Sequence, residues 1–249
     1  MPAASTVLTS RAAVTRRSWL SHGFSGIAYL EVRSCHDFHR RRGSRLERPT
    51  GSDRPSEPGT TLRSEQQRPE VPLLLGAWGP RGAALAGRIA GEIKVGGSAN
   101  PDMVPVMRER LLVGASRIGR DVAEIGVVLG AVTVVDTDGE AARARARTEV
   151  AMYLAVVAEL DPTVALPDGL VAEVGRLVDA GRDEEAGTLI PDDVLDRFAF
   201  SGTPEQVARQ AQSLIDAGVR RVEFGTPHGL TDDRGVELLG TEVLPLLSR

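Results

Sequence analysis

The 249-residue sequence has few of the residues that build covalent or metal-bound frameworks. It contains one cysteine, Cys35, so no disulfide can form within the chain. Its four histidines show no spacing typical of a metal site. Aromatic residues make up only 4% of the chain, and no apolar run approaches the roughly 20 residues that cross a bilayer. We therefore expect a cytoplasmic protein without a structural metal.

Lysine is also nearly absent, and charge divides the chain. Lys94 is the only lysine among 30 basic residues. Residues 1–70 hold 12 arginines and 7 acidic residues, whereas residues 71–249 hold 18 basic and 27 acidic residues, so their net charges are +5 and −9. Such a change in net charge indicates a boundary between two parts of the chain near residue 70. We expect residues 1–67 to be disordered or unrelated to the rest, and our hypothesis for their origin is a mis-started or frame-shifted segment in front of a truncated gene.

Beyond this boundary, the sequence shows the pattern strand, glycine turn, helix, strand, glycine turn. Residues 71–75 are a short apolar run without alternation, as in strands covered on both faces. Pro80 suits the first position of a helix, and residues 93–95 form the next strand. Small residues would let the apolar face of that helix lie close to the sheet. This face consists of Ala83, Ala84, Leu85, Ala86, Ile89 and Ala90.

Both turns are rich in glycine, and each precedes a helix. Residues 76–79 read Gly-Ala-Trp-Gly, and residues 96–100 read Gly-Gly-Ser-Ala-Asn. A helix N-terminus presents unpaired amides and the positive end of the helix dipole, which hold a phosphate without a lysine. Glycine lets the backbone approach the phosphate oxygens. The alternative is that tight turns between strands and helices need glycine whatever they bind.

The rest of the chain continues the alternation of strands and helices. Helices are predicted at residues 103–117 and 139–160, and further strands at residues 125–135 and 219–224. Residues 161–193 are predicted to be a helical insertion. A capping box with proline at the first helical position begins another helix at Thr203, Pro204, Glu205 and Gln206. The solvated face of helix 139–160 is predicted to carry Arg143, Arg145 and Arg147.

Four segments together resemble the luciferase-like flavin- or deazaflavin-dependent oxidoreductases, in particular the methylene-tetrahydromethanopterin reductase-like group. They are GAWGP from Gly76, IKVGGSANPD from Ile93, GVVLGAVTVVDTDGEAARARARTEVAMYL from Gly126 and SGTPEQVARQAQSLIDAGVRRVEFGTPHG from Ser201. The resemblance covers residues 68–249 and rests on the order and spacing of these segments. It implies an α/β fold that is a partial (β/α)8 TIM barrel, namely the C-terminal four βα units, preceded by the disordered N-terminal segment.

The resemblance also implies a site. In that family the cofactor phosphate is held by turns near the C-terminal ends of the later strands, where this kind of barrel places its sites. The implied cofactor is FMN or coenzyme F420, and the sequence does not decide between them. Two positions depart from the family pattern, because Trp78 replaces a small residue and Gly91 an acidic one. The implied cofactor-binding residues are Ala77, Trp78, Gly79, Gly96, Gly97 and Ser98.

The implied function is that of a luciferase-like oxidoreductase, which uses its cofactor for hydride transfer or monooxygenation of a small-molecule substrate. The alternative is a truncated, catalytically inactive half-barrel that acts only as a binding or interaction fragment. Its open strand edges would favour a homo-oligomer. Binding to nucleic acid or membranes is not expected, because the basic segment lacks interleaved aromatic residues and helical periodicity.

Three side chains near strand ends are further candidates, although the sequence assigns no catalytic residue. Lys94 precedes the second glycine turn and either approaches an anionic cofactor or forms an ion pair. Glu223 lies on the last strand, where a structural ion pair is the simpler alternative. His228 follows that strand and is either a ligand contact or a hydrogen-bonded loop histidine.

Overall fold

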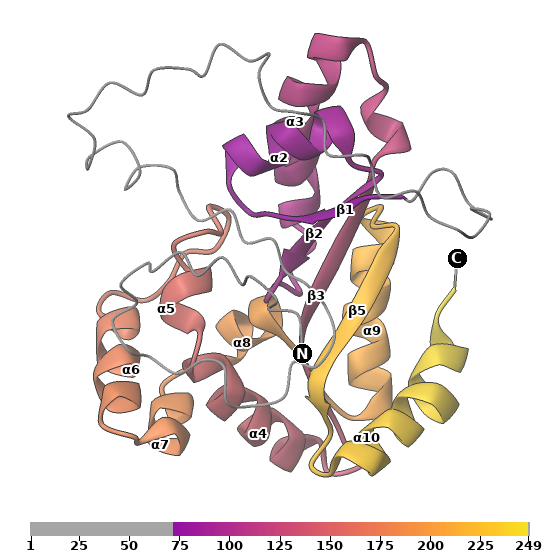
Figure 1. Cartoon of the computed structure of the whole chain (residues 1–249). Coiled ribbons are helices and arrows are strands. Elements are labelled where there is room, and N and C mark those ends of the chain that lie inside the picture. The colour runs from indigo at the N-terminus through magenta and orange to yellow at the C-terminus, as the bar shows by residue number, and fades with distance from the viewer. Residues whose placement is uncertain (1–71, 249) are drawn as a thin grey trace, which may run out of the picture. The chain divides into compact units, whose positions relative to one another are not determined.

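The computed structural model describes residues 72–248, so the expectations for residues 1–67 lie outside the described part of the chain. Its strands are β1 (Leu74–Gly76), β2 (Glu92–Gly96), β3 (Gly126–Val135), β4 (Ala199–Gly202) and β5 (Arg221–His228). Its α-helices are α2 (Pro80–Ile89), α3 (Met103–Ala115), α4 (Gly139–Ala151), α5 (Leu154–Val157), α6 (Leu170–Asp179), α7 (Asp183–Thr188), α8 (Asp192–Phe198), α9 (Pro204–Asp216) and α10 (Asp232–Leu238). Strands and helices alternate as the sequence predicts (Figure 1).

The strands form one parallel sheet. β1 pairs with β2, β2 pairs with β3, and β5 also pairs with β3. The order β1-β2-β3-β5, with helices as connections, is the arrangement of part of a (β/α)8 barrel and confirms the predicted fold class. The short strand β4 pairs with the second half of β3 and was not predicted. It has only four residues and follows α8 directly, so its apolar residues continue the pattern of that helix.

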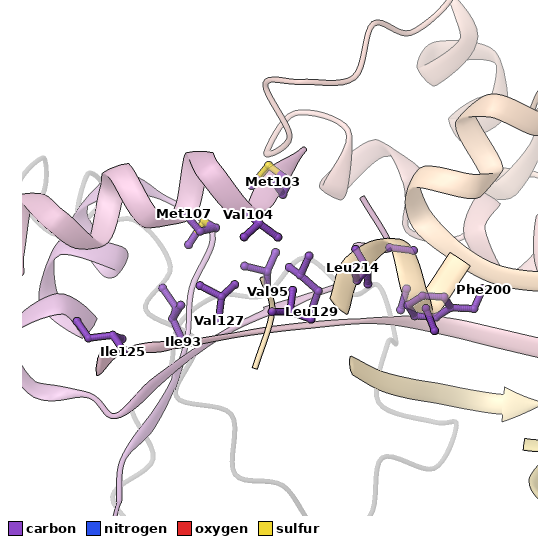
Figure 2. Close-up of a cluster of buried hydrophobic side chains, with 14 of the residues drawn as sticks. Ile93, Val95, Met103, Val104, Met107, Ile125, Val127, Leu129, Phe200 and Leu214 are labelled. Carbon is purple, nitrogen blue, oxygen red and sulfur yellow. The ribbon is translucent and has the colours of Figure 1, made fainter. Parts of the chain in front are cut away.

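The main core lies between the sheet and the helices that cover one of its faces. Alternate residues of β2 and β3 point to this side, as the two-residue period of a strand requires. Figure 2 shows them beneath the residues of α3 that contact them, with Phe200 of β4 and Leu214 of α9 in the same cluster. The labelled residues near α3 are fully or almost fully buried, and they are Ile93, Val95, Met103, Val104, Met107, Ile125, Val127 and Leu129.

The predicted apolar face of α2 is only partly buried. Ala83 and Ala86 are fully buried, but Leu85 and Ile89 are 38% and 52% exposed. The small residues of α2 instead bring it close to α3, because a methyl group added at Gly114 would lie only 1.7 Å from the carbonyl oxygen of Ala84. The absence of a side chain at Gly114 therefore sets the separation of the two helices.

A helical region from α4 to α8 has its own apolar cluster and lies apart from α2 and α3 (Figure 1). α4 ends at Ala151, and α5 begins at Leu154, so the single helix predicted for residues 139–160 is in fact two helices. The helices α6 and α7 agree with the helical insertion predicted for residues 161–193, whereas α8 begins at its end and continues to Phe198. None of the helices described in residues 72–248 combines the length and apolar composition needed to cross a membrane.

The arginines of α4 do not form the solvated face that the sequence predicted. Arg143 lies 3.0 Å from Asp192 and 2.7 Å from Asp196 of α8, and Arg147 also binds Asp192. The side chains of Arg143 and Arg147 are only 16% and 22% exposed, whereas Arg145 is half exposed. The hydrogen bond from Arg143 lowers the pKa of the Asp192 carboxyl. These ion pairs join α4 to α8.

Candidate functional site

The two glycine turns meet at the C-terminal ends of neighbouring strands. Gly76 pairs with Lys94 in the parallel ladder of β1 and β2, so both turns open at the same edge of the sheet. The amide of Ala77 donates to the carbonyl oxygen of Lys94 at 3.0 Å. The indole Nε1 of Trp78 donates to the carbonyl oxygen of Gly96 at 2.9 Å. We call residues 77–79 and 96–98 together the rim.

The first turn of the rim leads into a helix N-terminus without a side-chain cap. Gly79 is the N-cap residue of α2, and Pro80 occupies the first helical position. Amides in the first turn of a helix have no partner within the helix. A methyl group added at Gly79 would meet no atom within 4 Å, so the space beside this turn is open. Arg81 is exposed in the same helical turn and adds a positive charge.

The second turn of the rim is closed against the sheet. The amides of Gly97 and Ser98 both donate to the carbonyl oxygen of Gly130, at 2.6 and 3.1 Å, and Ser98 is fully buried. Gly97 has a φ of 84°, and a methyl group there would lie 3.0 Å from Val157. Gly96 is the exposed residue of this turn. In the predicted amide cradle, the amides of Ala77, Gly97 and Ser98 therefore already have partners, and the open space lies beside Gly79.

Tyr153 supports the second turn from the helical region. Its ring lies 3.6 Å from the position of a methyl group at Gly97. Its hydroxyl donates to the carbonyl oxygen of Phe198 at 2.6 Å, which ties this tyrosine to the end of α8. Burial raises the pKa of the Tyr153 phenol, so the hydroxyl remains a donor at neutral pH.

The other three candidates have partners within the protein. Lys94 Nζ lies 2.6 Å from Glu223 Oε1, and the pair spans β3, which lies between β2 and β5. The two side chains are 8% and 39% exposed. His228 has a φ of 75°, and its Nε2 lies 3.2 Å from the carbonyl oxygen of Phe224. The Lys94 contact agrees with the ion-pair alternative. His228 is hydrogen-bonded, but it is the last residue of β5 and not part of a loop after the strand, as the sequence had suggested.

A buried polar cluster behind the second turn was missed by the sequence analysis. Asn100 is fully buried, and its Nδ2 donates to Asp161 Oδ2 at 2.8 Å and to Thr163 Oγ1 at 2.7 Å. Its Oδ1 accepts from Arg197 Nη1 at 2.5 Å and from the amide of Asp102 at 3.0 Å. We call these five residues the Asn100 cluster. Asp161 and Arg197 lie 61 and 97 positions from Asn100 in the sequence, too far for any local pattern to indicate them.

Two surface hollows lie outside the rim. One, of about 370 Å³, lies between α2 and α3. The other, of about 420 Å³, lies at the opposite ends of the strands and includes Leu73, Leu74 and Arg221. Neither of these two hollows is lined by a residue of the rim.

Comparison with known proteins decides the family. The model of a family described as luciferase-like monooxygenase matches residues 30–221. This chain belongs to the luciferase-like monooxygenase family. The match confirms the resemblance seen in the sequence, and it begins within residues 1–67, the segment that the sequence analysis sets apart.

Several similar proteins of the family are named for coenzyme F420 or for reduction of a pterin. The chain is 29% identical over 184 residues to the 5,10-methylenetetrahydromethanopterin reductase of Methanolobus tindarius. This alignment covers 70% of this chain and 54% of the relative. It is 28% identical over 204 residues to the F420-dependent glucose-6-phosphate dehydrogenase of Nakamurella multipartita. That alignment covers 82% of this chain and 52% of the relative.

A solved structure agrees with these relatives. The coenzyme F420-dependent tetrahydromethanopterin reductase of Methanopyrus kandleri aligns with a TM-score of 0.60 at 26% identity, over 72% of this chain and 51% of that one. The chain therefore spans about half the length of the relatives that it matches.

Proposed function

We propose that this family member binds coenzyme F420 at the rim and acts as an F420-dependent oxidoreductase on a small organic substrate, by hydride transfer. One observation carries the proposal. The turns after β1 and β2 meet at the same edge of the sheet, beside the uncapped N-terminus of α2. Similar proteins named for F420 support the choice of cofactor. FMN is the second candidate, because its phosphate group has the same chemistry.

The first turn of the rim fits a phosphate group. In this proposal, the amides at the start of α2 donate to the phosphate oxygens, and the helix dipole favours its negative charge. Gly79 leaves space for the phosphate, because no atom lies within 4 Å of a methyl group built there. Arg81 adds a positive charge in the same helical turn.

The second turn of the rim has a different role in this proposal. Gly96 is exposed and contacts the ligand beside Trp78, whose indole links the two turns. Gly97 and Ser98 act by holding the turn in place, because their amides donate to the carbonyl oxygen of Gly130. The cofactor supplies the centre that carries the hydride, and the protein binds and orients it and excludes water.

A half-barrel that only binds its ligand is the second candidate function. The observation that favours it is that the chain spans about half the length of its relatives. Such a protein would bind F420 or FMN without turning over a substrate. The homo-oligomer and the cytoplasmic location stay predictions under either function.

Titration with F420 and, separately, with FMN tests the proposal. Purified full-length protein should change the fluorescence of F420 with a dissociation constant in the micromolar range, about −8 kcal/mol. Gly79→Asp should weaken binding at least about tenfold relative to Gly79→Asn. Both side chains have the same shape and both cap a helix, but only aspartate places a negative charge beside the phosphate. Equal affinities of the two variants, or no binding of either cofactor by the unmodified protein, would reject the proposed site.

A further inference from the structure

The Asn100 cluster joins three segments that are far apart in the sequence. Asn100 lies between β2 and α3, Asp161 and Thr163 follow α5, and Arg197 lies near the end of α8. Both N–H groups of the Asn100 amide donate, and its oxygen accepts twice, so all of its side-chain hydrogen-bonding capacity is used. Asn100 and Asp161 are 0% and 3% exposed, so water does not replace a partner that is lost.

Backbone hydrogen bonds connect this cluster to the rim. The amide of Asn100 donates to Ser98 Oγ at 3.2 Å. The amide of Ala99 donates to the carbonyl oxygen of Arg197 at 2.9 Å. The loop after the second turn is therefore fixed to α8 both by the Asn100 side chain and by its own backbone.

The same helical region also contacts the rim by packing. Tyr153 and Val157 both lie against Gly97, and the amide of Asp161 donates to the carbonyl oxygen of Val157 at 3.2 Å. Residues 153–163 thus touch the second turn at one end and the Asn100 side chain at the other. A displacement of this segment would displace the second turn as well.

We propose that Asn100 is the positioning residue of the rim. Its side chain holds the loop that directly follows the second turn, and its backbone amide bonds Ser98 Oγ. The first turn is linked to the second through the bond from Trp78 to Gly96. Asn100 is not a catalytic residue, because it lies behind the turn rather than on its exposed side. The ligand part of this inference rests on the proposed function, whereas the coupling between the second turn and residues 157–163 does not. Because coupling is reciprocal, a ligand at the rim also stabilises residues 157–163.

An amide is needed at position 100 because its partners include both acceptors and donors. Asp161 and Thr163 receive hydrogen bonds, while Arg197 and the amide of Asp102 provide them. Aspartate at this position would keep the shape and the acceptors, but it would lose both donors and place a second carboxylate beside Asp161. Asn100→Asp therefore disturbs the cluster with little change in volume.

Exchanging the side chains of Asn100 and Asp161 gives a variant that is matched to Asn100→Asp. The double variant Asn100→Asp with Asp161→Asn again places an amide opposite a carboxylate, with the direction of donation reversed. Arg176→Gln is the surface control, because it breaks the exposed pair of Arg176 with Glu173 on α6 without touching the cluster. Hydrogen exchange of residues 96–103 and 157–163 is measured in the full chain without cofactor, and F420 affinity is measured by fluorescence.

We expect Asn100→Asp to raise amide exchange in both segments about tenfold and to weaken F420 binding about tenfold, as expected for the loss of a buried hydrogen-bond partner. The double variant should recover most of both losses, and Arg176→Gln should change neither quantity. If Asn100→Asp does not fold, Thr163→Val removes the two bonds that the Thr163 hydroxyl makes with Asn100 and Asp161, and the same two measurements apply to it.

Unchanged exchange and affinity in Asn100→Asp would overturn the positioning role, and so would a double variant no better than the single one. The proposed function alone would be rejected if the unmodified protein bound neither F420 nor FMN while Asn100→Asp still raised amide exchange in both segments. The double variant would then still reverse that increase in exchange.

Discussion

Two glycines that flank β2 differ in what an added methyl group would meet. At Gly91 it would lie 3.7 Å from the carbonyl oxygen of Leu73, an ordinary contact, whereas Gly97 combines a φ of 84° with a contact of 3.0 Å to Val157. Gly91→Ala should raise the free energy of unfolding by about 0.4–1 kcal/mol, because it restricts the unfolded chain. Gly97→Ala should lower it by about 1–2 kcal/mol, because alanine disfavours a positive φ.

Urea unfolding of the two variants checks this pair, with each serving as the control for the other. If both substitutions changed the free energy of unfolding in the same direction, or if Gly97→Ala raised it, the second turn would not be held as described.

Individual residues of the rim were predictable, but their contacts were not. The glycine turns placed Trp78 and Ser98 near strand ends from local sequence alone. The bond from Trp78 to Gly96 depends on the register of β1 against β2, and the amide bonds to Gly130 depend on β3 as the next neighbour. A single sequence does not contain these registers, so the engaged amides of the second turn could not be foreseen.

At the scale of elements, the contact between α2 and α3 depends on a missing side chain. A methyl group at Gly114 would lie 1.7 Å from the Ala84 carbonyl oxygen, whereas one at Gly175 in α6 would meet no atom within 4 Å. Gly114→Ala should therefore lower the free energy of unfolding by about 1–3 kcal/mol through overpacking. Gly175→Ala should raise it by about 0.5–1 kcal/mol, since alanine is the better helix former.

Thermal or urea unfolding measures both substitutions, which make the same chemical change in two helices. If Gly114→Ala left the free energy of unfolding unchanged, α2 and α3 could separate without cost, which would contradict the close contact between them.

The ion pairs between α4 and α8 predict a pH dependence. Arg143 lowers the pKa of Asp192 in the folded protein, so this carboxylate stabilises the fold above its unfolded pKa of about 3.9. That contribution is lost as the pH falls through the lower, folded pKa. The difference in urea midpoint between the unmodified protein and Asp192→Asn should be present at neutral pH and should disappear once the pH lies below the folded pKa of Asp192.

Salt serves as the control for this pH experiment. The Asp192 side chain is 67% exposed, so its contribution is small and should shrink at high ionic strength. A difference that grows as the pH falls would contradict the assigned ion pairs.

Elements with strong local signals were predicted well. The capping box of α9 is present, with Thr203 Oγ1 accepting from the amide of Gln206 and the Gln206 side chain accepting from the amide of Thr203. The long apolar run of β3 was also found. β4 was missed, and α4 was extended too far, because four-residue strands and breaks between helices carry little local signal. The arginines of α4 were misjudged because their partners lie on α8.

At the scale of the whole molecule, the parallel order of the sheet places the candidate site. Parallel strands bring all their C-terminal ends to one edge, so turns about 20 residues apart become neighbours there. Family membership follows from the match over residues 30–221. The alternation of strands and helices predicted this architecture, but the Asn100 cluster needed the folded chain, because its members come from three separate segments.

Hydrogen exchange of the full chain with and without saturating F420 tests whether the rim holds the phosphate-bearing end of the cofactor. We expect slower exchange at the first turn of the rim and the start of α2, residues 78–82, and at residues 96–103. We expect no change at the opposite ends of the strands, around Leu74 and Arg221. Protection at those opposite ends, or no protection at residues 78–82 while F420 is bound, would contradict this placement of the cofactor.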